Sequence, residues 1–321
     1  MRIVFIATGD IALPAFRHLL TQGPRPLALV TQPDKPSGRH QVLTPPAIKT
    51  EALAAGIPVF QPEKIGDITA ELAALEPEIL VVMAYGQILR KNILTLASKA
   101  IINLHASLLP KYRGAACIQA AIAAGDAETG ITAMHVVREL DAGDVILSRS
   151  IAISPEETGG SLHDRLSDLA VEVIEETLAQ LDAGTAARIP QDPALVSYIP
   201  KLEREDGRID WSQAANVIER RIRAYDPWPG TFTVALVSRA KGQGEASDSP
   251  AAPPKEKRLK LFPPTTVVEM DLPPGEVVCH DGKWLVGCGQ GALQLHSVQP
   301  EGSKRMPAPD YFRGAPTSRF H

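Results

Sequence analysis

The chain of 321 residues has little cysteine and no hydrophobic run long enough to cross a bilayer. Its three cysteines, Cys117, Cys279 and Cys288, are scattered and form no C-x-x-C pair, which excludes a disulfide framework and a cysteine-based zinc site. The opening residues carry too few apolar side chains before Thr8-Gly9-Asp10 for a secretory signal. We therefore expect a protein of the reducing cytoplasm with no membrane partner.

Motifs for several common kinds of chemistry are also missing. The sequence contains no H-E-x-x-H, G-x-S-x-G or P-loop pattern, so zinc hydrolysis, an acyl-serine route and ATP use have no support, and we expect no metal. The run from Gly287 to Gly291 is rich in glycine, but it falls between two β-like runs and is typical of a turn. Gly9 alone after the first apolar run is too little for a dinucleotide fingerprint.

Charge is unevenly distributed along the chain. The formal net charge is −4, yet residues 1–206 carry 18 basic and 25 acidic side chains, whereas residues 207–321 carry 15 basic and 12 acidic ones. The second part is thus positive on an acidic protein. This favours a polyanionic partner, because Lys and Arg neutralise phosphates. A solvated surface of mixed charge explains the same counts equally well.

The first part of the chain alternates apolar runs with helical patterns. Candidate strands lie at 3–8, 27–31, 58–61, 79–83 and 100–104, and candidate helices at 13–20, 47–55, 68–75 and 161–183. Strands separated by helices predict an α/β domain with a doubly wound, mostly parallel sheet, similar to a Rossmann fold. Ligands bind beyond the carboxyl ends of the strands in such sheets, so we expect the site at that edge.

The pattern changes after the long helix, which Gly184 is expected to end. Residues 189–206 contain three prolines among mixed charges and suit a linker between domains at 1–188 and 207–321. Short β-like runs follow at 230–238, 259–262, 275–279, 283–287 and 292–298, and they predict a small β-barrel, with a hairpin turn at Asp281-Gly282. Residues 239–258 lack apolar side chains to pack, so we expect a mobile loop there.

The segment Asn103-Leu104-His105-Ala106-Ser107 carries the strongest chemical signal. In an extended strand Asn103 and His105 point to the same face, so an amide and an imidazole lie side by side where the site is expected. The amide N–H can donate to a developing oxyanion, and a neutral imidazole can take a proton from an attacking amine. Asp144, after a glycine-containing turn, is a candidate to orient the imidazole, although a turn aspartate is the plainer explanation.

The run from Asn103 to Gly114 resembles the signature of the folate-dependent formyltransferases, which place a Gly-Asp pair downstream. Within that superfamily the chain is similar, over nearly its full length, to the members that formylate methionyl-tRNA. The segments that carry this further likeness are 32–39, 84–89, 126–130, 208–211, 223–230 and 304–306. The resemblance implies transfer of the formyl group of the co-substrate 10-formyltetrahydrofolate to the α-amino group of methionine on initiator tRNA, with no protein nucleophile.

The resemblance also assigns roles to residues. It implies that Asn103, His105 and Asp144 are catalytic. The folate pocket would be formed by the backbone of Tyr85, Gly86, Gln87, Ile88 and Leu89 together with Ser107, Leu108, Leu109 and Pro110. Lys35, Arg39, Lys304 and Arg305 would contact the tRNA, and the C-terminal domain would be an OB-like barrel. The sequence departs from the family at Ala7-Thr8-Gly9, at Cys117, where a proline is common, and at 40–42, which lack lysine.

Two alternatives remain open. A formyltransferase acting on an amino-sugar nucleotide would keep the same Asn, His and Asp, but it would need neither the basic C-terminal part nor the loop from Pro33 to Arg39. A catalytically idle RNA-binding protein would have no use for those three side chains together. A monomer is the expected oligomeric state.

Overall fold

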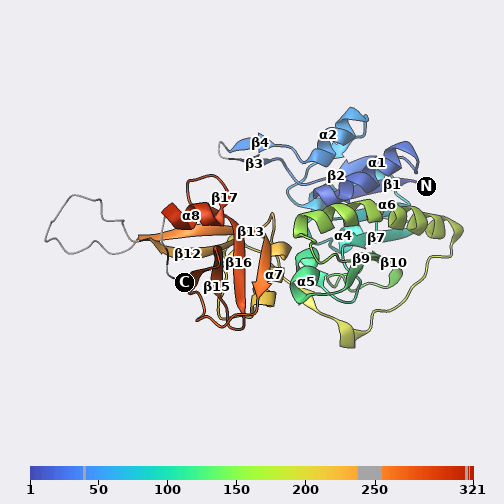
Figure 1. Ribbon diagram of the computed structural model, residues 1–321. Coiled ribbons are helices and arrows are strands. Elements are labelled where there is room, and N and C mark those ends of the chain that lie inside the picture. Colours follow the sequence, from blue (N-terminus) through green and yellow to red (C-terminus); the bar gives the residue numbers. More distant parts are fainter. Residues whose placement is uncertain (39–40, 238–254, 315–316, 318) are drawn as a thin grey trace, which may run out of the picture. The chain divides into compact units, whose positions relative to one another are not determined.

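The computed structural model describes residues 1–38, 41–237, 255–314, 317 and 319–321, and it separates into two compact units. The first unit contains Met1–Ile118, Ala127–Ala152 and Leu162–Pro200, and the second contains Gln119–Asp126, Ile153–Ser161 and Lys201–His321. In Figure 1 the colours run along the sequence, from blue at the N-terminus to red at the C-terminus. Among the described residues, no helix combines the length and the apolar character that crossing a membrane demands.

A seven-stranded sheet forms the centre of the first unit, with the strand order β10-β9-β7-β6-β1-β2-β5. Its strands are β1 (Ile3–Ala7), β2 (Ala28–Val30), β5 (Val59–Phe60), β6 (Ile79–Met83), β7 (Ala100–His105), β9 (Glu128–His135) and β10 (Val145–Ala152). The first five run parallel, while β9 and β10 add an antiparallel edge next to β7. The prediction of a mostly parallel α/β sheet is confirmed, although the sequence reading missed β9.

Helices cover the faces of this sheet (Figure 1). They are α1 (Leu13–Thr21), α2 (Ala47–Ala54), α3 (Thr69–Ala74), α4 (Lys91–Leu94) and α6 (Gly159–Ala183), with short 3-10 turns η1 (Asp10–Ala12) and η2 (Ile65–Ile68). Most of a further helix, α5 (Cys117–Ala124), belongs to the second unit. The hydroxyl of Ser167 on α6 donates to the carbonyl of Ile11, which fixes this long helix beside the first turn. Gly184 ends α6 as expected, with a φ of +68° that favours glycine.

The core of the first unit explains its long apolar runs. Every residue of β1 and β6 is buried, as two-sided burial in a parallel sheet requires. One face packs Val4, Ile6 and Leu80 against side chains from η2 and α3. Each such side chain contributes about 1.5–3 kcal/mol on burial. The carboxyl ends of β6 and β7 are thereby held in a fixed position.

An antiparallel sheet forms the second unit, with the order β12-β13-β16-β15-β14 and β17 paired to β16. The elements are β12 (Thr231–Val237), β13 (Lys255–Val268), β14 (Val277–His280), β15 (Lys283–Gly287), β16 (Ala292–Pro300), β17 (Met306–Pro307), α7 (Ala215–Ala224), α8 (Ala308–Gly314) and the turn η4 (Arg204–Gly207). The end of the chain closes this sheet, because Phe320 bridges to Ala235 of β12 and Arg319 bridges to Glu276 before β14. The predicted small barrel is therefore a sheet that the C-terminal segment closes.

Local turn chemistry and strand ends agree only partly with expectation in this unit. The hairpin between β14 and β15 is confirmed, with His280 opposite Lys283 and positive φ angles at Asp281 and Gly282. The expected loop at 239–258 is too long at its second end, because β13 already begins at Lys255. Residues 239–254 of that loop lie outside the described residues.

The expected linker at 189–206 is not a free tether. Up to Pro200 it belongs to the first unit, where the turn η3 (Pro193–Leu195) leads into β11 (Tyr198–Ile199), and β11 pairs in parallel with β8 (Arg113–Gly114). Gly114 is required here, since a Cβ at this position would lie 2.2 Å from the carbonyl oxygen of Ile199, and its φ is +109°. Proline content indicated an irregular segment but gave no sign of this pairing.

Candidate active site

Asn103 and His105 lie at the carboxyl end of β7, on the strand edge where ligands of parallel sheets bind. His105 is 6% exposed and Asn103 is half-buried. The Nε2 atom of His105 lies 2.9 Å from the carbonyl oxygen of Tyr112. The sequence reading correctly placed both groups on one strand end.

The carboxylate that joins them is that of Asp141. Its Oδ1 accepts from Asn103 Nδ2 at 3.4 Å, and its Oδ2 lies 3.7 Å from His105 Nδ1. The same Oδ2 accepts from the backbone N–H of Gly114 at 2.8 Å. The expectation that Asp144 orients His105 is wrong, because the structure brings Asp141 there instead.

The turn between the two aspartates explains the correction. Gly143 lies so close to β9 that a Cβ would be 1.7 Å from the carbonyl oxygen of His135. The carbonyl of Asp144 accepts from the N–H of His135, so Asp144 already belongs to the antiparallel edge with β9. Asp141, before the glycine, has a φ of +50°. This left-handed conformation, uncommon for aspartate, directs the chain back toward β7.

Burial and three neighbours set the pKa of His105. Desolvation lowers its pKa, but the interaction with Cys117 at the start of α5, then with Asp141, and the contact with the Tyr112 carbonyl outweigh it and raise the pKa to about 9. A raised pKa favours the protonated imidazole, which is a hydrogen-bond donor, over the neutral base expected from the sequence. Cys117, which had no expected role, lies beside His105.

The expected folate segment after β7 is firmly built. Ser107 is fully buried and its hydroxyl donates to the carbonyl of Lys111 at 2.7 Å. The hydroxyl of Thr132 on β9 donates to the Ser107 carbonyl at 2.7 Å and accepts from the N–H of Leu109 at 3.2 Å. Leu108, Leu109 and Pro110 are half-buried. These contacts fix the loop as a rigid surface next to His105.

In the second expected folate segment, Tyr85 to Leu89, some side chains are buried in the core and others are exposed. Tyr85 and Leu89 pack into the hydrophobic cluster of the sheet, and burial raises the pKa of Tyr85 to about 12. The side-chain amide of Gln87 bonds to the Ile65 N–H and the Glu63 carbonyl. Ile88 is 72% exposed, so this side chain and the backbone at Gly86 are the parts free to meet a ligand.

Three of the four expected tRNA contacts are described. Lys35 is exposed on β3 (Lys35–Ser37), which forms a hairpin with β4 (Val42–Thr44) away from the central sheet (Figure 1). Arg39 lies outside the described residues. Lys304 is exposed, and Arg305 stacks its guanidinium 4.3 Å from the ring of Phe262 while donating to Ser297 Oγ and the Pro263 carbonyl.

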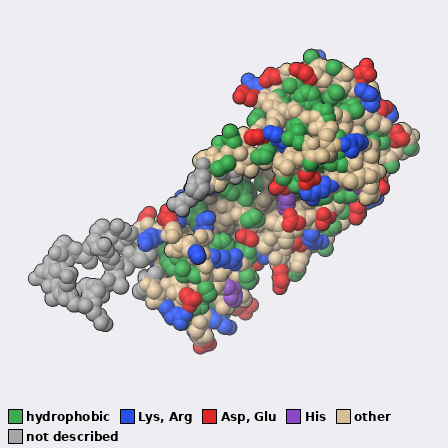
Figure 2. All heavy atoms as spheres, turned by 90° about the horizontal axis from the view of Figure 1, so that it is seen from above, with side chains coloured by type: hydrophobic (Ala, Val, Ile, Leu, Met, Phe, Trp, Pro, Cys, Tyr) green, Lys and Arg blue, Asp and Glu red, His purple; other side chains and the backbone are tan. Residues whose placement is uncertain are grey.

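The sequence reading missed further cations next to Arg305. Arg258, Lys260 and Phe262 alternate along β13 with the buried Leu259 and Leu261, so they share its outer face. Arg258 lies 4.3 Å from the ring of Phe232. We name the set Arg258, Lys260, Lys304 and Arg305 the cationic strip. Figure 2 shows that Lys and Arg side chains gather in several clusters on the visible face of this unit.

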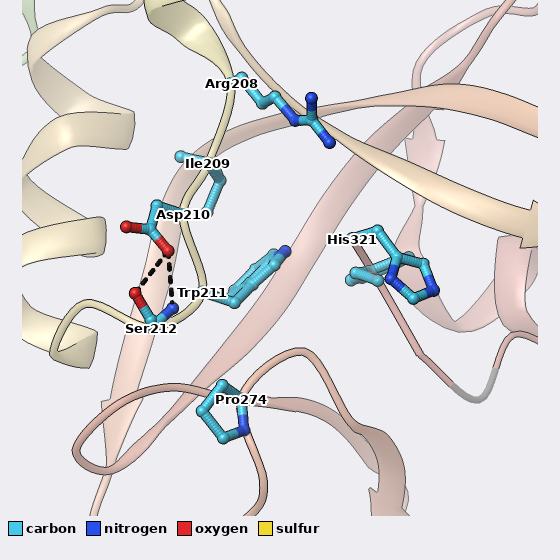
Figure 3. Close-up of a pocket in the computed structure, with 8 residues that line it drawn as sticks. Arg208, Ile209, Asp210, Trp211, Ser212, Pro274 and His321 are labelled. Atoms are coloured by element: carbon cyan, nitrogen blue, oxygen red, sulfur yellow. Dashed lines mark hydrogen bonds between the residues drawn. The ribbon is translucent and has the colours of Figure 1, made fainter.

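A separate pocket of about 440 Å³ lies wholly in the second unit. It is lined by Arg208, Ile209, Asp210, Trp211, Ser212, Pro274, Phe320 and His321. Figure 3 shows the indole of Trp211 extending from the 208–212 segment toward His321, with Pro274 below it. Trp211 donates to Thr233 Oγ1 at 2.9 Å, and Asp210 accepts from Ser212. None of the expected catalytic or folate residues lines this pocket.

Together these features are those of a Rossmann-like α/β group transferase, with an amide, an imidazole and a carboxylate gathered at the end of a parallel strand, and with a second β-domain. Among the described residues, no cluster of His, Cys, Asp or Glu is arranged to hold a metal ion. The chain belongs to the formyl transferase family: the family model for the formyl transferase domain matches residues 1–178, and that for its C-terminal domain matches residues 201–316.

Named relatives are similar in sequence to almost the whole chain. The methionyl-tRNA formyltransferase of Akkermansia muciniphila is 48% identical over 320 residues, covering 98% of this chain and 97% of the relative. That of Geobacter metallireducens is 41% identical, covering 98% and 96%. The family resemblance inferred from the sequence is confirmed.

Solved structures share the fold at low identity. HypX from Aquifex aeolicus in complex with tetrahydrofolic acid matches with a TM-score of 0.59 and 20% identity, covering 97% of this chain and 47% of HypX. The N-formyltransferase from Helicobacter canadensis, in complex with folinic acid and dTDP-3-aminofucose, matches with a TM-score of 0.64 and 14% identity, covering 95% and 100%. At these identities the likeness speaks for the fold alone.

Proposed function

We propose that the chain transfers the formyl group of 10-formyltetrahydrofolate to the α-amino group of methionyl initiator tRNA, in the cytoplasm and as a monomer. The observation that carries this is the triad Asn103, His105 and Asp141 at the end of β7, within a family whose full-length relatives of 48% and 41% identity are methionyl-tRNA formyltransferases. No metal is needed for this reaction, because charge stabilisation comes from hydrogen-bond donors.

Asn103 and His105 stabilise the charge that develops on the formyl oxygen. The substrate amine attacks the formyl carbon, and the oxygen becomes negative as the new C–N bond forms. The amide N–H of Asn103 and the protonated imidazole of His105 donate to this oxygen. One oxyanion donor is worth about 10² to 10³ in rate. The raised pKa of His105 keeps that proton in place at neutral pH.

Asp141 stabilises the positive charge of His105 and also accepts the proton of the attacking amine. Its carboxylate lies 3.7 Å from His105 and 3.4 Å from Asn103, so it stabilises the imidazolium and aligns the amide. One proton must leave the attacking amine and one must reach the departing folate nitrogen. Asp141 takes up the first and His105 delivers the second, which leaves both groups neutral. Transfer of the proton from Asp141 to His105 then restores the carboxylate and the imidazolium.

Folate and tRNA would use different surfaces. The rigid loop from Ser107 to Pro110 and the exposed Ile88 offer the half-apolar surface that a flat pterin ring needs. The cationic strip and Lys35 would hold tRNA phosphates. Arg305 and Arg258 are preorganised by their stacking on Phe262 and Phe232, so they lose little side-chain entropy on binding.

An amino-sugar nucleotide is the second candidate acceptor. It is favoured only by fold likeness to proteins such as the Helicobacter canadensis enzyme, at 14% identity. The test is to incubate the protein and 10-formyltetrahydrofolate with charged initiator tRNA or with a dTDP-amino-sugar. We expect formyl-methionine on the tRNA only. Formylation of the sugar with none of the tRNA would reverse the assignment.

A further inference from the structure

Gln191 makes an unusual set of contacts in the segment that follows α6. Its side-chain Oε1 accepts from Arg113 Nε at 3.0 Å and from Arg113 Nη2 at 2.8 Å. Its Nε2 donates to two backbone carbonyls, those of Asp141 and Gly143, each at 2.8 Å. The side-chain amide of Gln191 thus accepts from the loop of Arg113 and donates to the loop of residues 141–143.

Both loops belong to the site. Asp141 presents its carboxylate to Asn103 and His105, and the same carboxylate accepts from Gly114, the residue after Arg113. The backbone at Asp141 has a φ of +50°, a conformation that persists only where its surroundings hold it. The two donations from Gln191 hold the carbonyls of Asp141 and Gly143, on either side of Ala142 in this turn.

We propose that Gln191 is a positioning residue for the formyl transfer: it holds the Asp141 turn so that the carboxylate stays against His105. The inference rests on the proposed function for its kinetic consequences, because the contacts themselves do not depend on the acceptor. Gln191 acts through Asp141 and touches no reacting atom. The segment expected to be a linker is thereby part of the catalytic unit.

The rest of the segment is fastened without Gln191. Ser197 accepts from Tyr112 N–H through its hydroxyl at 2.9 Å and from Arg113 N–H through its carbonyl at 2.8 Å. The carbonyl of Ile199 accepts from the N–H of Ala115 at 3.1 Å. Removal of the Gln191 amide therefore leaves β8 and β11 paired, and variants are expected to fold.

Two substitutions separate the donor and acceptor roles. Gln191→Glu keeps an acceptor for Arg113 but loses the N–H donors and turns a carboxylate oxygen toward two carbonyls. Gln191→Met loses both functions with nearly unchanged shape. A matched control is Gln180→Met on α6, whose side-chain amide bonds to Glu176 on the same helix and, within the described part of the chain, to no residue of the site. If Gln191 merely satisfied Arg113, Gln191→Glu would behave as wild type.

We expect Gln191→Glu and Gln191→Met to lower kcat at least about tenfold, because misplacing a catalytic group by about 1 Å costs up to 10² in rate. The KM for the folate should change less than about threefold, since its surface is untouched. Gln180→Met should match wild type. Unchanged kcat in both Gln191 variants would overturn the proposal.

A second readout reports the position of the carboxylate directly. The groups that face His105 are Asp141, the thiol of Cys117 on α5 and the Tyr112 carbonyl. A carboxylate that moves away removes a neighbouring opposite charge, so the pKa of His105, followed by NMR of labelled histidine, should fall by about half a unit or more in Gln191→Met. A lowered kcat with an unmoved His105 titration would show a merely structural role and sink the inference.

This titration needs no substrate, so it distinguishes the two proposals. If the wild type fails to formylate methionyl-tRNA but His105 titrates lower in Gln191→Met, the acceptor is wrong and the positioning role stands. If the wild type formylates methionyl-tRNA and neither kcat nor the titration responds to Gln191, the acceptor stands and the positioning role is wrong.

Discussion

The site at the end of β7 and the cationic strip of the second unit hold their polar groups in opposite ways. His105 and Asn103 are buried or half-buried and bonded within the site, whereas Arg258 and Lys260 are exposed on a sheet face, where Arg258 pairs with the exposed carboxylate of Glu205. Interactions between buried groups are strong because the dielectric constant is low, so their energy depends on the position of single atoms. Salt screens them little. Exposed cations act through many weak phosphate contacts that salt competes for. The chemical step and tRNA binding should therefore respond to different changes.

The largest expected effect separates two aspartates three residues apart. Asp141→Asn should lower kcat at least about a hundredfold, because it removes the carboxylate that stabilises the His105 imidazolium and accepts a proton. Asp144→Asn should stay within about threefold of wild type, since Asp144 lies next to His135 and not His105. Steady-state kinetics with charged initiator tRNA measure both. Equal losses in the two variants would contradict the assignment of Asp141.

The pH dependence of the chemical step should follow His105. Its pKa is raised to about 9, so the protonated, active form is present below that value and is lost as pH rises through it. The rate at saturating substrates should fall about tenfold per pH unit above the basic limb. A single-turnover profile between pH 7 and 10.5 measures this limb. A rate that kept rising to pH 10.5 would restore the role of neutral base.

A smaller effect is expected in the cationic strip. Lys260→Ala should raise the KM for charged tRNA about threefold at physiological salt, leave kcat unchanged, and reduce the slope of log KM against log salt by about one. Lys283→Ala, an exposed lysine on the β15 hairpin outside the strip, is the matched control. Identical tRNA kinetics for the two variants would remove the strip from the binding surface.

The smallest effect concerns the thiol beside His105. Cys117→Ala should leave kcat within about threefold at pH 7 but move the basic limb to lower pH by about half a unit, because the thiol helps to raise the pKa of His105. Cys279→Ala, an exposed cysteine of the second unit, should leave the profile unchanged. An unmoved limb in Cys117→Ala would mean that Asp141 and the Tyr112 carbonyl raise this pKa without the thiol.

Features with local causes were predictable from the sequence. Gly184 ends α6, and Asp281-Gly282 turns the hairpin, because both positions need a positive φ that the residue types reveal. The continuous apolar runs of β1 and β6 likewise predicted strands that are buried on both faces of the sheet. Asn103 and His105 followed from strand alternation alone.

Features with distant causes were not predictable. The choice between Asp141 and Asp144 depends on how Gly143 packs against His135, which chain spacing does not reveal. Gln191 lies in a segment whose prolines indicate a linker, and its partners are 48 to 78 residues away. The strand β9 begins in the polar Glu128-Thr129-Gly130, where no apolar run marks it.

The most direct test of the whole account is the salt dependence of formylation of charged initiator tRNA, measured both at saturating and at limiting tRNA. With about four phosphates neutralised, the apparent KM for tRNA should rise tenfold or more between 50 and 200 mM salt. The rate at saturating tRNA should stay nearly constant, because the site at Asn103, His105 and Asp141 is shielded from salt. A KM that ignores salt, or a saturated rate that falls with it, would contradict the division between a buried chemical site and an exposed tRNA surface.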